Sequence, residues 1–209
     1  MVTLDPSILQ SVEKPARYTG SEWNAVRKNP DEVRCTFALA LPDVYEVGMS
    51  NLGLAILYEI LNGRADVAAE RVYAPWTDME AIMRERQLPL YSLETKTEIR
   101  SFSFLGFSLQ YEMIYSNVLN MLDLAGIPLH AAERTEADPF VVGGGPCVYN
   151  VEPIADFFDF FVVGEGEEVL LEVVDVYEAW QAEGRTDGRQ GFLRRLLAVD
   201  GIYVPSFYT

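Results

Sequence analysis

Sulfur and imidazole ligands are scarce in this chain, which has two cysteines and one histidine among 209 residues. Cys35 and Cys147 stand far apart, and no CxxC or CxxxCxxC run is present. A disulfide framework and a cysteine-held iron–sulfur cluster are therefore excluded within this chain. The single His130 excludes a metal site built on a pair of histidines.

Positive charge and long apolar runs are also lacking. The chain has 16 Lys and Arg residues against 32 Asp and Glu residues, which gives a formal net charge of −16. Such a balance argues against direct nucleic-acid binding and against adhesion to anionic membranes. No apolar run approaches the ~20 residues of a membrane-spanning helix, and residues 1–13 do not resemble a signal peptide. We therefore expect a cytoplasmic protein with no membrane or nucleic-acid partner.

What the chain does have is hydrophobic content of 49% arranged in alternating strand-like and helix-like segments. Continuous apolar runs of this kind are typical of strands covered on both faces. The expected strands are Cys35–Leu41, Glu70–Ala74, Phe102–Leu109, Phe140–Val142 and Phe157–Val163. The expected helices between and after them are Leu52–Leu61, Thr77–Arg86, Tyr111–Ala125, Glu167–Gln181 and a helix near Gly191–Ala198.

Strands that alternate with helices predict an α/β fold with right-handed crossovers. We expect a Rossmann-like or flavodoxin-like parallel sheet of five strands with helices on both faces, and an N-terminal arm. The predicted organisation has an arm over residues 1–33 and an α/β domain over 34–185. Residues 186–209 would form a C-terminal helix and an extended segment.

Two glycine-rich corners follow expected strands and carry the functional hypothesis. Gly143-Gly144-Gly145-Pro146 comes directly after one apolar run, and Gly164-Glu165-Gly166 follows the next. Backbone without side chains lets a ligand, or another backbone segment, come close. Because the carboxyl ends of parallel strands meet at one edge of the sheet, both corners are expected at a common binding face.

Polar residues follow two other strands. Ser108 and Gln110 can hydrogen-bond a ligand amide, and Ser108 can equally cap the following helix. Asn51 is expected to cap the helix after the first strand, and Thr77-Asp78-Met79-Glu80 resembles a capping box. Glu165, Glu167 and Glu168 stand at a helix start, where carboxylates offset the positive end of the helix dipole.

The loops, in their order, resemble the N-terminal region of radical S-adenosylmethionine (SAM) proteins that contain a cobalamin-binding domain. The matching stretches cover nearly the whole chain: KPARYTG (14–20), FALALPDVYEVGMS (37–50), RVYAPW (71–76), GFSLQYE (106–112), NVLNMLD (117–123), GGGP (143–146) and GEGEE (164–168). The resemblance implies a longer protein in which this domain precedes a radical SAM barrel, its partner. A four-iron four-sulfur cluster and S-adenosylmethionine are expected only in that C-terminal part, because the CxxxCxxC signature is absent here.

The resemblance also implies a cobalamin site, with one departure from the family pattern. Asp43-x-Tyr45-x-x-Gly48 has tyrosine where a cobalamin-binding domain has the histidine that ligates cobalt. A neutral phenol with a pKa of about 10 is a poor substitute for imidazole, so histidine-on binding is excluded. Base-on binding, or binding without a lower protein ligand, stays open. The expected cofactor-binding residues are Asp43, Tyr45, Gly48, Ser108, Gln110, Gly143, Gly144, Gly145, Gly164, Glu165 and Gly166, with no catalytic and no metal-ligating residue.

Three functions follow from these observations. The first is a cobalamin-binding platform for cofactor or substrate. The second is an interaction module that keeps the fold, has lost cobalamin and docks on the radical SAM barrel. The third is an independent small enzyme using Asp43, Glu46, Glu112 and Glu165, which is disfavoured because no nucleophile–base pair is visible.

Overall fold

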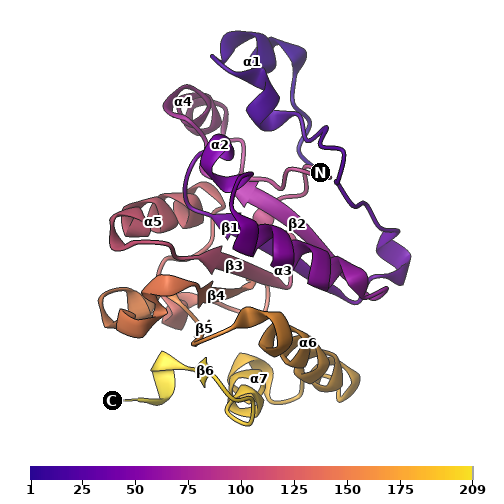
Figure 1. The fold of residues 1–209 in the computed structure, drawn as a ribbon, viewed down its shortest axis with the longest axis vertical. Coiled ribbons are helices and arrows are strands. Elements are labelled where there is room, and N and C mark those ends of the chain that lie inside the picture. The colour runs from indigo at the N-terminus through magenta and orange to yellow at the C-terminus, as the bar shows by residue number, and fades with distance from the viewer. Residues whose placement is uncertain (209) are drawn as a thin grey trace.

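One sheet of six strands forms the middle layer of the molecule (Figure 1), in a computed structural model that describes residues 1–208. The strands are β1 (Cys35–Leu41), β2 (Val67–Tyr73), β3 (Phe104–Ser108), β4 (Phe140–Gly144), β5 (Phe160–Val162) and β6 (Ile202–Tyr203), in the order β2-β1-β3-β4-β5-β6. β1 to β5 pair in parallel. The order of these five strands is that of flavodoxin-like sheets.

The α/β class and the parallel sheet are confirmed, but the prediction of five strands is wrong. β6 adds a sixth strand, which pairs antiparallel with β5 through Phe161–Tyr203 and Val162–Ile202. The sequence marks Ile202–Val204 as extended, but two residues are too short for the alternation that identifies a sheet strand.

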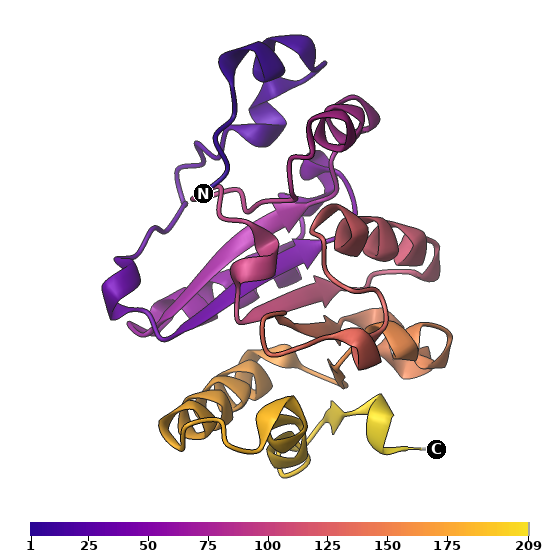
Figure 2. The same ribbon diagram turned by 180° about the vertical axis from the view of Figure 1, so that it is seen from behind.

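Helices cover both faces of the sheet, as predicted (Figures 1 and 2). On one face α3 (Leu52–Gly63), α6 (Gly166–Ala182) and α7 (Gly188–Leu196) pack on Phe37, Phe104 and Phe140. The opposite face packs against α1 (Pro6–Ser11), α4 (Thr77–Arg86), α5 (Tyr115–Leu124) and the 3₁₀ turns at 146–157. α2 (Tyr45–Gly48) is a single turn after β1. Within residues 1–208, no helix has both the length and the apolar run that crossing a bilayer requires.

The start of one helix agrees with the sequence prediction, and the starts of two others differ from it. Asn51 caps α3, because its Oδ1 accepts a hydrogen bond from the Leu54 amide at 2.8 Å. The predicted capping box at Thr77 is wrong: Thr77 is already helical, and the preceding Trp76 makes no side-chain cap. The helix expected from Tyr111 instead opens with a 3₁₀ turn, Glu112–Ile114, and α5 begins at Tyr115.

The connection from β4 to β5 contains two 3₁₀ turns in place of an α-helix. Asp159, just before β5, anchors it. Its carboxylate accepts hydrogen bonds from the Val141 amide at 2.8 Å and from Arg134 and Arg189, each at 2.8 Å. The three charged side chains are buried together, so each charge has the partner that burial demands.

The N-terminal arm runs along the β2 edge of the sheet (Figures 1 and 2). Ile8, Val12 and Tyr18 are buried against the main core. Lys28 donates to the carbonyl oxygens of Asn62, Arg64 and Val67, which ties the arm to the end of α3. The arm is therefore fixed by apolar and polar contacts with the α/β domain.

Candidate functional site

A groove of about 490 Å³ lies at the carboxyl edge of the sheet, between the first turns of α3 and α6. Its floor consists of β1, β3 and β4, and its walls come from the two helices and the loop after β4. The chain leaves β1 towards β2 and leaves β3 towards β4, so the connections diverge between these neighbouring strands. Such a divergence is where ligands bind in open α/β sheets.

Two glycines leave the floor of the groove without side chains. Alternation along the strands places Gly106 and Gly144 on the same face as Leu39 and Val142. A Cβ at Gly144 would meet nothing within 4 Å, and one at Gly106 would meet only Leu39 Cδ2 at 3.8 Å. The fold does not require glycine for packing at either position, so the space above them is open to a ligand.

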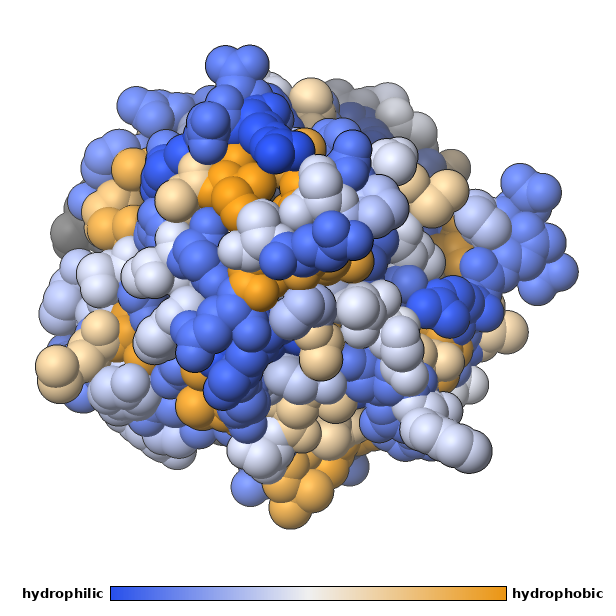
Figure 3. Space-filling view, turned by 90° about the horizontal axis from the view of Figure 1, so that it is seen from above, coloured by the Kyte–Doolittle hydropathy of each residue, from blue (hydrophilic) through white to orange (hydrophobic). Residues whose placement is uncertain are grey.

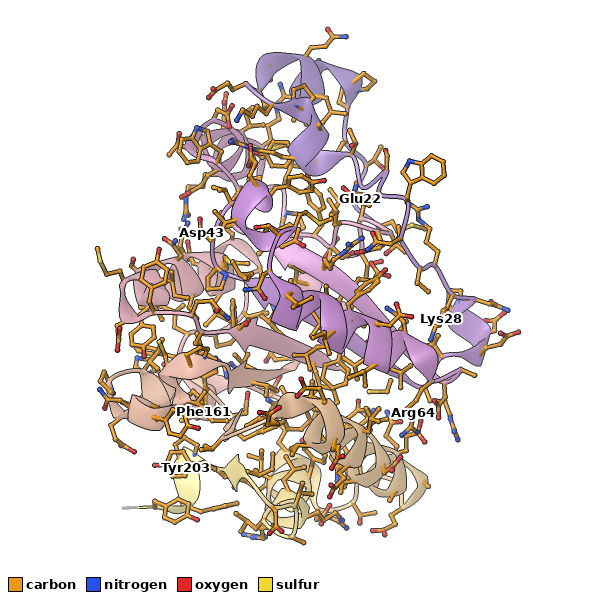
Figure 4. The ribbon with its side chains drawn as sticks, viewed as in Figure 1. Glu22, Lys28, Asp43, Arg64, Phe161 and Tyr203 are labelled. Atoms are coloured by element: carbon orange, nitrogen blue, oxygen red, sulfur yellow. The ribbon has the colours of Figure 1, made fainter. Side chains whose placement is uncertain are left out.

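The glycines on either side of Gly144 are explained by the protein's own packing. A Cβ at Gly143 would lie 2.4 Å from the ring of Phe161, which stacks on Tyr203 with centroids 6.3 Å apart (Figure 4). Gly145 has φ +98°, and a Cβ there would lie 3.0 Å from the carbonyl oxygen of Leu109. All three glycines line the groove, but only Gly144 leaves space that the protein does not use.

Ser108 and Gln110 both line the groove, at the end of β3. Gln110 Nε2 donates to Ser108 Oγ at 2.7 Å. Ser108 caps no helix, because the turn that follows begins at Glu112 after Tyr111, without a side-chain cap. Of the two roles expected for Ser108, the polar groove residue is the one its position allows.

The second glycine corner forms the wall at α6. Gly164 has φ +116°, which favours glycine, and Gly166 lies close to α3, with its Cβ position 3.4 Å from Leu57 Cδ2. Glu165 stands before the helix and makes no side-chain cap, and Glu167 lies in the first turn. The positive ends of the α3 and α6 dipoles thus flank the groove, and the carboxylates of α6 offset part of that positive potential.

Three of the predicted site residues, Asp43, Tyr45 and Gly48, do not line the groove. Tyr45 donates its hydroxyl to Glu22 Oε1 on the arm at 2.9 Å, and burial together with this carboxylate raises the pKa of Tyr45 to about 12. A Cβ at Gly48 would lie 2.1 Å from Tyr73 Cε1. The loop after β1, where Figure 4 shows Asp43, is held by its own contacts.

The carboxylates of the disfavoured enzyme hypothesis are not brought together. Glu165 lines the groove, whereas Asp43, Glu46 and Glu112 do not. Glu46 is paired with Arg17 at 2.9 Å and Lys14 at 3.0 Å, which hold its pKa at about 2. Across residues 1–208 no three His, Cys, Asp or Glu side chains are grouped to hold a metal ion.

Some groove residues were missed by sequence reasoning. Gly106 lies in the middle of an apolar strand, and such a glycine is itself a signal of close approach. Asn51, Leu57 and Tyr149 also line the groove. Nothing in their spacing marks them, because they meet only when α3 and the loop after β4 pack on the same edge.

Comparison with known families accounts for most of the chain. The family model described as "Radical SAM proteins, N-terminal" matches residues 53–205, from the first turn of α3 to beyond β6. The chain belongs to this family of radical SAM N-terminal domains. The match includes both glycine corners and the walls of the groove.

One curated relative of this radical SAM N-terminal domain is an uncharacterized protein, MJ0966, of Methanocaldococcus jannaschii, which is 36% identical over 96 residues. The aligned part is 44% of this chain and 20% of that protein's length, so the chain spans a small share of this relative. No solved structure matches the chain. The family description places such a domain at the N-terminus of radical SAM proteins, whose radical SAM domain we call the companion domain.

Proposed function

We propose that this radical SAM N-terminal domain is a cofactor platform that holds part of a cobalamin molecule in the groove at the carboxyl edge of the sheet. The observation that carries the proposal is the open floor at Gly106 and Gly144, in a groove at the point where the strand connections diverge. Space of this kind is what a bulky guest needs, and the packing of the chain gives no other reason for it.

The size of the groove indicates which part of the cofactor it would hold. At about 490 Å³ it lies within the ~300–1,000 Å³ range of small-molecule sites. Cobalamin is larger than a drug-sized ligand, so we assign the groove to its nucleotide tail, with the corrin ring outside. The bound cofactor would supply a cobalt centre to the chemistry of the companion domain.

The lining suits a flat base joined to a polar sugar. Leu39, Val142 and Leu170 give an apolar floor and wall, and Ser108 and Gln110 give hydrogen-bonding groups at one end. A mostly apolar pocket with a few placed polar groups is typical of cofactor sites. Tyr45 is committed to Glu22, which agrees with binding that uses no lower protein ligand.

Uptake of hydroxocobalamin tests the proposal. The purified chain is mixed with excess hydroxocobalamin and desalted, and the visible spectrum of the protein fraction is recorded. We expect the corrin absorbance to stay with the protein. A colourless protein fraction after incubation at high cobalamin concentration would remove the proposal for this domain.

A second candidate is an interaction module that has lost cobalamin and docks on the radical SAM domain. The observation in its favour is Tyr45, which stands where the resemblance to cobalamin-binding domains would place a histidine and is hydrogen-bonded within the protein. This candidate predicts no corrin absorbance in the same experiment, together with measurable association with the companion domain.

A further inference from the structure

Large apolar side chains are exposed in the loops and first helical turns that follow four neighbouring strands. They are Val47 and Leu52 after β1, Trp76 after β2, Tyr111 and Met113 after β3, and Tyr149 after β4, and we call them the edge set. Met113 is 83% exposed, Tyr149 81% and Leu52 73%. These residues are far apart in the sequence, and they share one edge because the carboxyl ends of parallel strands meet there.

Exposed apolar side chains are grouped in the edge set, whereas on the rest of the surface they are scattered. The remaining exposed large apolar residues are Met1, Trp23, Ile56, Leu197 and Tyr208, and of these only Ile56 follows one of the four strands, one turn further along α3 than Leu52. The end of the molecule with α1 and α4 is mostly hydrophilic, with small separate apolar patches (Figure 3). Apolar side chains gathered in one region of a surface, and rimmed by polar residues, are typical of interaction sites.

We infer that the edge set is the docking surface for the companion radical SAM domain of the same protein. Family membership supplies this partner, and the relative from Methanocaldococcus jannaschii is much longer than the aligned region, which is 20% of its length. The turn Pro205–Phe207 after β6 lies on the side towards which β1, β2 and β3 point, so a domain that follows it is tethered beside this edge (Figures 1 and 2).

Charge argues for this partner over a second copy of the chain. Exposed carboxylates of Glu112, Glu152 and Glu165 lie in the segments that follow β3, β4 and β5, within a chain of net charge −16. Two such edges would repel each other, because like charges placed face to face oppose association. The fitting partner surface has an apolar centre and basic side chains around it.

The groove opens at this same edge. Tyr149 both lines the groove and belongs to the edge set, and Leu52 follows the groove residue Asn51. A companion domain docked here covers the mouth of the groove and encloses its ligand between two domains. This closing of the groove rests on the proposed function, whereas the docking surface rests on family membership and on the exposed side chains.

Hydroxyl-radical footprinting tests the docking surface without any cofactor. Tyr, Trp and Met side chains are oxidised readily when solvent reaches them, so the edge set carries its own probes. The 209-residue chain is compared with the protein that also contains the radical SAM domain. We expect oxidation of Trp76, Met113 and Tyr149 to fall several-fold in the longer protein. Trp23 on the arm, 105% exposed, should be oxidised equally in both.

A matched pair of substitutions in the longer protein supports the assignment. Met113→Glu places a charge in the edge set and should restore oxidation of Trp76 and Tyr149. Trp23→Ser removes an equally exposed apolar residue outside the edge set and should leave the protection unchanged. Neither side chain is buried, so both variants are expected to fold, which circular dichroism checks.

The outcomes separate the alternatives. Equal oxidation of the edge set in both proteins overturns the docking surface. Protection that is already present in the 209-residue chain and rises with its concentration assigns the edge to a second copy and also overturns the proposal. If the edge set is protected from oxidation in the longer protein but hydroxocobalamin is not retained in the desalting experiment, the docking surface is supported and only the cobalamin proposal is overturned.

Discussion

Adjacent glycines in this domain serve different physical purposes. Gly143 faces the core side of β4 and leaves room for the Phe161 ring, whereas Gly144 faces the groove and leaves room that no protein atom fills. The sequence presents them as one run, and both packing and ligand approach are sound hypotheses for such a run. The structure assigns packing to Gly143 and Gly145 and leaves only Gly144 for a ligand.

Substitution of Gly144 is therefore expected to separate binding from folding. Gly144→Val fills the floor of the groove, and valine is well suited to a strand, so the stability of the protein should change by less than about 1 kcal/mol. Retention of hydroxocobalamin should be lost. Gly143→Ala is the control: its Cβ would meet Phe161 at 2.4 Å, and such overpacking costs about 1–3 kcal/mol. Chemical denaturation and the desalting experiment measure the two effects.

Two results would contradict this division of roles. An unfolded Gly144→Val variant would show that Gly144 also serves packing. A folded variant that retains cobalamin as well as the unsubstituted chain would place the ligand away from the groove floor.

At the level of elements, the sequence predicted most helices and strands because their apolar spacing is regular. β1 and α4 have the predicted bounds, and Asn51 caps α3 as expected. The predicted capping box at Thr77 is wrong because Thr77 is the first helical residue and Trp76 is the N-cap. The local motif alone does not show where the helix begins. β6 could not be predicted, since two residues become a strand only through their pairing with β5.

Glu46 joins two elements, the arm and α2, through Arg17 and Lys14. Its hydrogen bonds to Arg17, and then to Lys14, hold its pKa at about 2, below the ordinary value of 4.5. Since the folded protein has the lower pKa, the stabilisation is fully present above pH 4.5 and is lost as the pH falls towards 2. The side chain is 42% exposed, so solvent screening limits the contribution to at most about 1 kcal/mol.

Glu46→Gln should therefore lower the free energy of unfolding at pH 7 by up to about 1 kcal/mol, and the difference should shrink between pH 4.5 and 2. It should also speed tryptic cleavage at Arg17, whose guanidinium loses its carboxylate partner. Glu59→Gln is the matched control, because Glu59 is exposed and makes no ion pair within residues 1–208. Equal effects of the two substitutions at every pH would show that the ion pairs of Glu46 do not stabilise the protein.

At the scale of the whole molecule, the sequence predicts the fold class but not the strand order. After each helical crossover the next strand can pair on either side of β1, and local sequence patterns do not determine which side it takes. The site was also predicted only in part. The sequence predicts that the glycine corners meet at one edge, because parallel strands end there. The absence of Asp43, Tyr45 and Gly48 from the groove depends on how α2 packs against the arm, which no local spacing shows.

Net charge is a property of the whole chain, and it has a measurable consequence. A net charge of −16 makes the compact state repel itself. Added salt shortens the Debye length from about 30 Å at 0.01 M to about 8 Å at 0.15 M, which weakens this repulsion. Surface ion pairs weaken too, but each contributes at most about 1 kcal/mol, and the excess of carboxylates leaves many of them without a basic partner.

We therefore expect the thermal midpoint at pH 7.5 to rise when NaCl is increased from 0.01 to 0.15 M. A gain of about 1 kcal/mol corresponds to about 2–4 °C for a chain of this size. The rise should diminish as the pH is lowered towards the sequence pI of about 4.4, because protonation removes the repelling charges. A non-ionic osmolyte of equal osmolality controls for general solvent effects. A midpoint that falls with salt at pH 7.5 would mean that attraction within ion pairs, such as those of Arg64 and Arg195, outweighs the repulsion of the whole molecule.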